Sequence, residues 1–184
     1  MKKFISIIMV IIMLLSMLTA CSFNKTDNDE STRKIVDITG AEIEIPNKVD
    51  EVVNLFPFGC QLMIGLGLDE YLVGISDSTI ETAWLEVMFP EVKNIKAYPD
   101  DVDAEALLAV QPDVVFCSDP EQAQEFRNKG ITAITFMYLS IEDFKYTINL
   151  MGEILDGKAQ EKCNSYIEYL DEKMGGLDEK SKRF

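Results

Sequence analysis

Residues 103–119 read DAEALLAVQPDVVFCSD, a stretch in which a helix signal is followed by a strand signal. Asp103 is a favourable N-cap, and Glu105 lies in the first turn, where an acid suits the helix dipole. The run that starts at Asp113 is short, apolar and β-branched, which is typical of a strand covered on both faces. A helix that leads into a buried strand indicates the α/β class.

Three further apolar runs have the same character. They are VVNLF from Val52, LVGIS from Leu72 and ITAITF from Ile131. The segments between them are helical or long enough to contain a helix, and 120–130 begins with proline and ends with glycine, as helices often do. Strand, helix and strand in repetition predict a parallel sheet with right-handed crossovers. We therefore expect an α/β fold, a three-layer lobe with helices on both faces of the sheet.

A hairpin is predicted where this body begins. Two short β-prone runs, 35–38 and 43–45, lie on either side of Thr39-Gly40. Gly40 suits the tight turn that such a spacing requires.

Two helices are predicted at the other end. Ser140 and Asp143 resemble a capping box, so we expect a helix from here to about residue 155, ended by Asp156-Gly157. A second helix is expected over 158–174, because apolar residues at spacings of three and four give it one apolar face. These residues are Cys163, Ile167, Leu170 and Met174. The glycine pair that follows weakens the helix, and the chain continues as a polar tail.

The composition argues against several classes of function. The net charge is −15, which disfavours binding of nucleic acid through a basic patch. The chain has no histidine, so it lacks the commonest transition-metal ligand and the usual general base at neutral pH. No nucleophile has a recognisable base either. We predict no catalytic residue, no metal site, no cofactor and no enzymatic activity.

Besides Cys21, the chain has three cysteines, Cys60, Cys117 and Cys163, with no short CxxC spacing. An odd count argues against a disulfide framework. A single bridge between Cys60 and Cys117 stays open, and free, partly buried thiols are the favoured interpretation.

The first 21 residues, MKKFISIIMVIIMLLSMLTAC, have the layout of a secretory signal, with a cationic start, an uncharged apolar run and small residues before Cys21. The run is short for a membrane span and no basic cluster follows it, so a permanent transmembrane helix is the weaker interpretation. LTAC at 18–21 resembles the lipobox of bacterial lipoproteins, in which the cysteine thiol receives a diacylglycerol and the chain is cut just before it. The alternative is an ordinary signal peptide in which Cys21 is incidental.

Four segments follow from these patterns. We expect a lipoprotein signal peptide over 1–20 and a polar, disordered tether over 21–33. An α/β lobe is expected over 34–157, and a helix with a polar tail over 158–184.

The order of these elements resembles a known family, the substrate-binding lipoproteins of bacterial ABC importers for ferric siderophores, haem and cobalamin. The resemblance runs from about residue 34 to residue 174. Its most specific parts are GLG followed by LVGIS, and PDVVF after a helix that starts with glutamate. The matching stretches are DITGAEIEIP at 37–46, EVVNLFPFGCQLMIGLGLDEYLVGISD at 51–77, DAEALLAVQPDVVFCSD at 103–119, KGITAITF at 129–136 and SIEDFKYTINLMGEILDGKAQEKCNSYIEYLDEKM at 140–174.

The resemblance implies the N-terminal lobe of a class III periplasmic-binding-protein fold. In that fold two α/β lobes are joined by one rigid helix, here expected at 158–174, and the ligand lies between them. We expect the second lobe to be absent from this chain. Members perform no chemistry; they deliver a small molecule, here a ferric siderophore, haem or corrinoid, to an ABC permease and its ATPase.

The same resemblance implies a location. A lipid on Cys21 would anchor the protein to the cell membrane on its extracytoplasmic face, beside the permease. The alternative function is that of a surface lipoprotein that uses this lobe as a protein-interaction module and takes no part in transport.

Ligands of open α/β sheets bind at the loops that follow the carboxyl ends of the strands. Three such loops contain candidate ligand-binding residues, and the resemblance places four of these residues, Pro57, Phe58, Ser78 and Ser118, where relatives contact their ligand. It places Tyr98 near another such position, whereas Phe56 and Trp84 could equally belong to the core. The full set of candidates is Phe56, Pro57, Phe58, Gly59, Ser76, Ser78, Trp84, Tyr98 and Ser118.

Glu105 is a candidate for a different contact. It precedes Pro112 by seven residues, the spacing at which relatives carry an exposed glutamate that pairs with permease arginines. The resemblance therefore implies that Glu105 docks on the permease through a charge-assisted pair. The alternative is that Glu105 only stabilises the first turn of its helix, an effect worth under about 1 kcal/mol.

Overall fold

A computed structural model describes residues 31–181 of the chain. The predicted signal peptide, the lipidation site Cys21 and nearly all of the tether lie outside the described residues. Residues 182–184, at the end of the predicted tail, lie outside them as well.

The main sheet within residues 31–181 has five parallel strands in the order β5-β4-β3-β6-β7. The four predicted apolar runs form four of these strands, and parallel pairing is confirmed. The strands are β3 Val52–Asn54, β4 Leu72–Ser76, β5 Lys96–Tyr98, β6 Val114–Cys117 and β7 Ala133–Thr135.

β5 was not predicted. It has only three residues, reads KAY, and lies at the edge of the sheet, where one exposed lysine is tolerated. An apolar run is the signal of a strand whose residues are all buried, as in the other edge strand, β7, and the partly exposed β5 does not carry it.

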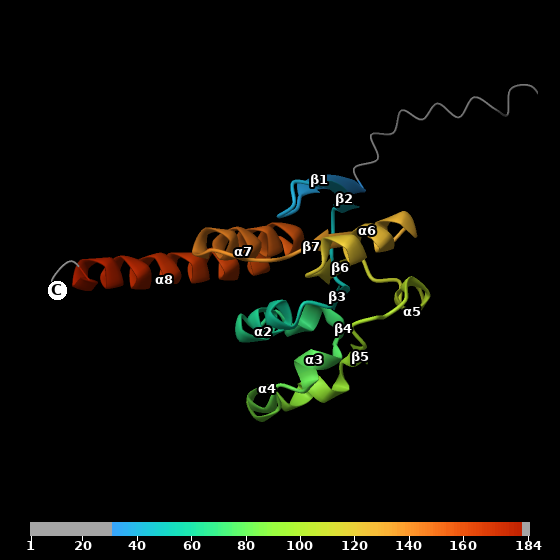
Figure 1. Ribbon diagram of the computed structural model, residues 1–184, viewed down its shortest axis with the longest axis horizontal. Helices are drawn as coiled ribbons and strands as arrows, with labels where there is room; N and C mark the ends of the chain where they lie inside the picture. Colours follow the sequence, from blue (N-terminus) through green and yellow to red (C-terminus); the bar gives the residue numbers. More distant parts are fainter. Residues whose placement is uncertain (1–30, 182–184) are drawn as a thin grey trace, which may run out of the picture. The chain divides into compact units, whose positions relative to one another are not determined.

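Helices cover both faces of the sheet, as the three-layer prediction requires (Figure 1). One core cluster joins Val52 and Phe116 of the sheet to the helices on the first face, and the other joins Val53 and Val115 to helices on the opposite face. On the first face lie α2 Pro57–Gly65, α7 Ile141–Leu155 and α8 Gly157–Ser181. On the second lie α5 Ala104–Leu108 and α6 Pro120–Asn128.

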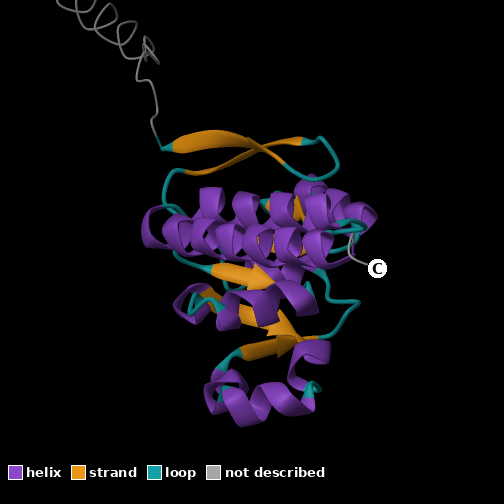
Figure 2. Cartoon of the chain, turned by 90° about the vertical axis from the view of Figure 1, so that its left-hand side faces the viewer, coloured by secondary structure: helices purple, strands orange, loops and turns teal. Residues whose placement is uncertain are grey.

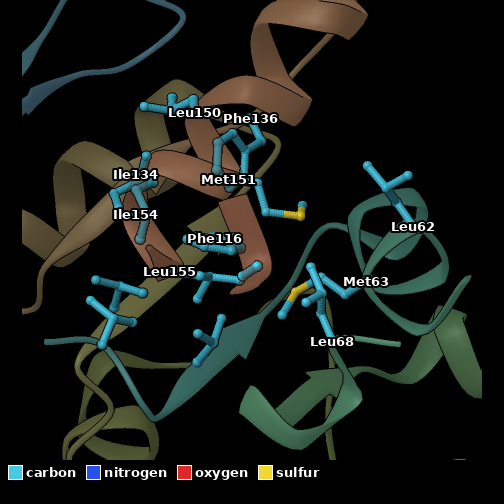
Figure 3. Close-up of a cluster of buried hydrophobic side chains, with 14 of the residues drawn as sticks. Leu62, Met63, Leu68, Phe116, Ile134, Phe136, Leu150, Met151, Ile154 and Leu155 are labelled. Carbon is cyan, nitrogen blue, oxygen red and sulfur yellow. The ribbon is translucent and has the colours of Figure 1, made fainter. Parts of the chain in front are cut away.

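The larger core lies between β6, β7 and α7 (Figure 3). Phe116 and Phe136 are fully buried and meet edge to face, with ring centroids 4.3 Å apart. Met151 and Ile154 of α7 belong to the same cluster. Burial of each such side chain contributes about 1.5–3 kcal/mol, so this contact holds α7 against the sheet.

Four short helices lie next to β4 in the chain, one before it and three between β4 and β5. The segment after β4, predicted as a loop, is already helical from Asp77. These helices are η1 Asp69–Tyr71, α3 Asp77–Ile80, α4 Ala83–Met88 and η2 Pro90–Asn94.

Three of the predicted helix boundaries are confirmed by their caps. The Asp103 carboxylate accepts a hydrogen bond from the Ala106 N–H at 2.7 Å, and Ser140 Oγ accepts one from the Asp143 N–H at 3.0 Å. Asp156 and Gly157 have φ values of 57° and 51°, which end α7 as predicted.

α8 is longer than predicted. The glycine pair after Met174 does not end it, and the helix continues to Ser181. Glycine costs a helix only about 1 kcal/mol relative to alanine, so helical neighbours on both sides can carry the helix through it. None of the helices in the described part of the chain is long and apolar enough to cross a membrane.

α7 and α8 pack unusually closely. A Cβ atom on Gly152 would lie 2.9 Å from Cys163 Cβ, so a larger side chain would push the two helices apart. Lys145 and Asp171 form an ion pair further along the same contact. This close packing joins α8 to the lobe through α7.

The three cysteines of the described part are free and buried, which confirms the favoured interpretation. Cys60 and Cys163 lie in the core on one face of the sheet, and Cys117 lies in the core on the other. Burial raises the pKa of the Cys60 and Cys117 thiols to about 12. These thiols are therefore unreactive at neutral pH.

The predicted hairpin is present as β1 Thr32–Val36 and β2 Glu42–Pro46, and its first strand begins earlier than expected. Figure 2 shows it at the top, apart from the strands of the main sheet. Ile35, Ile43 and Ile45 bury their side chains in the larger core. The hairpin therefore adds to the core without extending the sheet.

The Asp37 carboxylate ties the hairpin to β7. Asp37 is 1% exposed, and its Oδ1 accepts hydrogen bonds from the Thr39 hydroxyl at 2.5 Å and from the N–H groups of Thr39 and Ala41 at 2.9 and 3.1 Å. Its Oδ2 accepts one from the Thr135 N–H at 3.2 Å, with Arg127 Nη1 3.8 Å away. Burial alone would raise the pKa of this carboxyl, but the hydrogen bonds outweigh burial and hold its pKa below the usual value.

We predict that Asp37→Asn lowers the free energy of unfolding by about 2 kcal/mol at pH 7, because its amide would place N–H groups against the Thr135 N–H and Arg127. Because the folded-state pKa of Asp37 is lowered, its carboxylate stabilises the fold above the unfolded pKa of about 3.9, and this contribution is lost as the pH falls through the folded-state pKa. Urea denaturation at about pH 7, 4 and 2 should show the two proteins converging at the acidic end.

Glu42→Gln is the matched control, because Glu42 belongs to the same hairpin and forms an exposed ion pair with Lys34. We expect it to change the free energy of unfolding by less than about 0.5 kcal/mol. Equal losses in the two variants would contradict the role assigned to Asp37.

Candidate functional site

The chain changes direction at the carboxyl edge of β3. β3 lies between β4 and β6; it leads into α2 on one face of the sheet, whereas β6 leads into α6 on the other. The connections after these two neighbouring strands therefore separate and leave a crevice. Such a switch point is where ligands bind in open α/β sheets.

Asn54 shapes the turn that leaves β3. It is fully buried, and its side-chain oxygen accepts a hydrogen bond from the Phe56 N–H at 3.0 Å. Its backbone carbonyl accepts a hydrogen bond from the Cys60 thiol at 3.0 Å. These contacts hold Phe56 and the start of α2 against the end of the strand.

Gly59 is required for the same turn. A Cβ atom at Gly59 would lie 2.9 Å from the Phe56 ring and 3.1 Å from the Asn54 amide nitrogen. The groups that approach this glycine closely are therefore side chains of the protein itself.

A polar hollow of about 370 Å³ lies at the crevice. Ser78 Oγ lies 3.4 Å from Asp100 Oδ1, and Gln122 Nε2 donates a hydrogen bond to the Asp100 carbonyl at 2.9 Å. The Asp119 carboxylate caps α6 by accepting a hydrogen bond from the Glu121 N–H at 2.9 Å. The hollow is lined by Leu55, Pro57, Ser78, Asp100, Ser118, Asp119 and Gln122.

Beside the polar hollow stands a cluster of aromatic rings, which we call the aromatic wall: Phe56, Phe58, Tyr138 and Phe144. The Phe58 ring centroid lies 4.9 Å from that of Tyr138 and 5.5 Å from that of Phe144, and the Phe56 and Tyr138 centroids are 6.0 Å apart. These are the tilted and edge-to-face contacts that aromatic rings prefer. The wall is therefore a packed unit.

Two apolar hollows flank Phe58. One, of about 570 Å³, is lined by three residues of the aromatic wall, Phe58, Tyr138 and Phe144, together with Leu139, Ser140 and Ile141. The other, of about 400 Å³, lies between α2, α4 and α8 and is lined by Trp84 and Tyr166 among others. Pro57 lines the polar hollow and Phe58 lines both apolar ones, so adjacent residues of one turn join the three.

The four residues that the resemblance placed at ligand contacts are brought together. Pro57, Ser78 and Ser118 line the polar hollow, and Phe58 stands at its side in the aromatic wall. Phe56 is half-buried behind Phe58 and packs against the core as well. Trp84 is 53% exposed, so it is not a core residue, and it faces an apolar hollow.

Two candidates with polar side chains, Ser76 and Tyr98, lie apart from the hollows. Ser76 is 1% exposed, and its hydroxyl is hydrogen-bonded to those of Ser78 and Thr79, both at 3.1 Å, so it supports Ser78 from below. Tyr98 is 2% exposed, and its ring packs over Gly74 in the second core. Both side chains point into the protein rather than beyond the edge of the sheet.

Sequence reasoning missed several residues of the site. Tyr138 follows β7, and it could have been found by searching the loop after the fourth predicted strand as well. Asp119 directly follows the candidate Ser118 and lies in the same loop. Asp100 follows the unpredicted strand β5, and Gln122 and Phe144 lie in helices and carry no separate signal.

Glu105 is exposed in the first turn of α5. Near it, an acidic surface includes Asp101, Asp103, Glu121 and Glu125. Within residues 31–181, no group of three or more His, Cys, Asp or Glu side chains is placed to hold a metal ion.

No protein-family model matches this chain. Two proteins of Bacillus subtilis (strain 168) are similar to it in sequence. The ABC transporter substrate-binding lipoprotein YvrC is 23% identical over 99% of this chain and 60% of its own length. The iron(3+)-hydroxamate-binding protein YxeB is 22% identical over 100% of this chain and 59% of its own length.

A solved periplasmic solute-binding protein from Veillonella parvula has a similar fold, with a TM-score of 0.72 and 22% identity, over 81% of this chain and 48% of that protein. The chain thus spans about 60% of the curated relatives and about half of that structure. These similarities confirm the resemblance predicted from the sequence: one relative is an ABC transporter substrate-binding lipoprotein, the other is an iron(3+)-hydroxamate-binding protein, and the fold of this chain matches about half of a periplasmic solute-binding protein.

Proposed function

We propose that this protein is the solute-binding component of an ABC importer, which captures an iron chelate or a related compound and delivers it to the permease and its ATPase. One observation carries the proposal: the polar hollow and the aromatic wall meet at Pro57 and Phe58, on the edge of the sheet where ligands of α/β folds bind. An iron(3+)-hydroxamate-binding protein among the sequence relatives supports this ligand class.

The two surfaces suit the two parts of an organic chelate. Phe58 and Tyr138 offer flat apolar area to its hydrocarbon portions. Ser78, Ser118 and Gln122 offer hydroxyl and amide groups to its oxygen atoms. Binding of this kind needs no reactive group, in keeping with relatives that are binding proteins.

A protein-interaction module is the second candidate function. α4 exposes three apolar side chains on one side, with Trp84 at 53%, Val87 at 79% and Met88 at 76%. Apolar side chains grouped in this way are typical of protein contacts. Binding assays with a chelate separate this function from transport.

We predict that the protein binds a ferric trihydroxamate and that Phe58→Ala or Tyr138→Ala weakens binding about tenfold, because each removes one face of the aromatic wall. Calorimetric titration measures the affinity, and thermal denaturation checks that each variant is folded. Tyr169→Ala is the control, since Tyr169 is an exposed aromatic residue of α8 that lines none of the three hollows. Failure to bind any iron chelate, haem or corrinoid would favour the interaction module.

Docking on the permease is proposed for Glu105. We predict that Glu105→Gln leaves chelate affinity unchanged and lowers ligand-stimulated ATP hydrolysis by the importer in proteoliposomes by about fivefold or more. Glu142→Gln is the matched control, because Glu142 is also exposed in the first turn of a helix, α7. Equal activity of the two variants would assign Glu105 to helix stabilisation alone.

The membrane anchor is proposed at Cys21. We predict that the protein incorporates radiolabelled palmitate in a bacterial host and fractionates with the membrane, and that Cys21→Ser abolishes both. Cys117→Ala tests thiol specificity, since Cys117 is buried. Labelling that survives in Cys21→Ser would contradict lipidation at this residue.

A further inference from the structure

The residues around the proposed binding surface carry charge of one sign. Asp100 and Asp119 line the polar hollow, and among the described residues that line this hollow and the two apolar ones there is no lysine or arginine. Serine hydroxyls, two glutamine amides and aromatic rings make up much of the remaining lining. The electrostatic potential at the crevice is therefore negative.

Four basic side chains in the described part of the chain are engaged in contacts outside the three hollows. Lys96, the basic residue of β5, lies over the Tyr98 ring at 4.7 Å from its centroid. Arg127 donates hydrogen bonds to the Ala133 carbonyl and to Gln124 Oε1 at 2.9 and 3.0 Å. Lys129 and Lys145 are paired with carboxylates on their own or neighbouring helices.

Helix N-termini do not reverse this sign. α6 points its N-terminus toward the polar hollow, but the Asp119 carboxylate already caps it. α2 begins at Pro57 and has no side-chain cap, so its first turn can receive an oxygen atom of the ligand. A helix N-terminus amounts to about half a positive charge, which is less than the charge of the two carboxylates.

We propose that this surface selects iron chelates of neutral or positive charge and discriminates against anionic ones. The inference rests on the proposed function and narrows its ligand class. Three hydroxamate groups neutralise a ferric ion, and a chelator with a free amine makes the complex cationic. A ferric tris-catecholate carries three negative charges and haem carries two carboxylates, so both would meet Asp100 and Asp119 with repulsion.

The test compares three probes on the full chain by calorimetric titration: ferrioxamine B, a ferric trihydroxamate with a free ammonium group; its N-acetylated, neutral form; and ferric enterobactin, a tris-catecholate. We expect the cationic probe to bind about tenfold more tightly than the neutral one and the anionic probe to bind most weakly. Raising the salt from about 0.05 M to about 0.5 M should reduce the difference, because the Debye length shortens to a few ångströms. Quenching of Trp84, the single tryptophan, gives an independent readout beside the site.

The double variant Asp100→Asn/Asp119→Asn removes both charges and keeps the cap of α6, since asparagine caps helices as well as aspartate does. We expect it to bring the cationic and neutral probes within about twofold of each other. Glu42→Gln/Glu44→Gln changes the net charge equally on the exposed face of the hairpin and should leave the preference intact.

The outcomes separate the inference from the function on which it rests. An anionic probe that binds as tightly as the cationic one would overturn the inference and leave the proposed function standing. So would a preference that the double aspartate variant retains. Absence of binding for all three probes, together with haem and a corrinoid, would overturn the proposed function itself.

Discussion

The hydrogen bond from the Phe56 N–H to the buried Asn54 side chain is the contact on which the candidate site depends. β3 has strands on both edges and helices on both faces, so the only open space around it lies beyond its carboxyl end. Asn54 turns the backbone there, and α2 starts after two further residues. Pro57 and Phe58 are thereby presented at the crevice in the first turn of α2.

The position of this turn also determines which surface each of its residues faces. Pro57 faces the polar hollow, which the loops after β4, β5 and β6 complete, whereas Phe58 faces the rings that follow β7. The place of each strand in the sheet therefore decides which side of the turn its loop lines. A chelate that spans the turn would meet hydroxyl groups and carboxylates on one side and aromatic faces on the other.

The sequence predicts those features that depend on burial. The central strands are recognisable because both their faces are covered, and the helix ends are recognisable because Ser140, Asp103 and Gly157 have the side chains or backbone freedom that caps need. β5 and the site acids are harder, since an exposed edge strand and a surface carboxylate have no periodic signal. Tyr98 shows why side-chain direction is hard to predict. It lies at the carboxyl end of β5, close to the site, but its side chain points into the core. The direction depends on how β5 pairs with β4, which the sequence alone does not reveal.

The contact of α8 with α7 has a mechanical consequence. Gly152 and Cys163 join the first half of α8 to the lobe, and Tyr166 faces Phe144 of the aromatic wall with ring centroids 6.5 Å apart. The Lys145–Asp171 ion pair extends this contact further along α8, and beyond Asp171 the helix runs on to Ser181, a length of about 15 Å at 1.5 Å per residue. A tilt of α8 by about 5° about its contact with α7 would therefore displace its far end by about 1.3 Å.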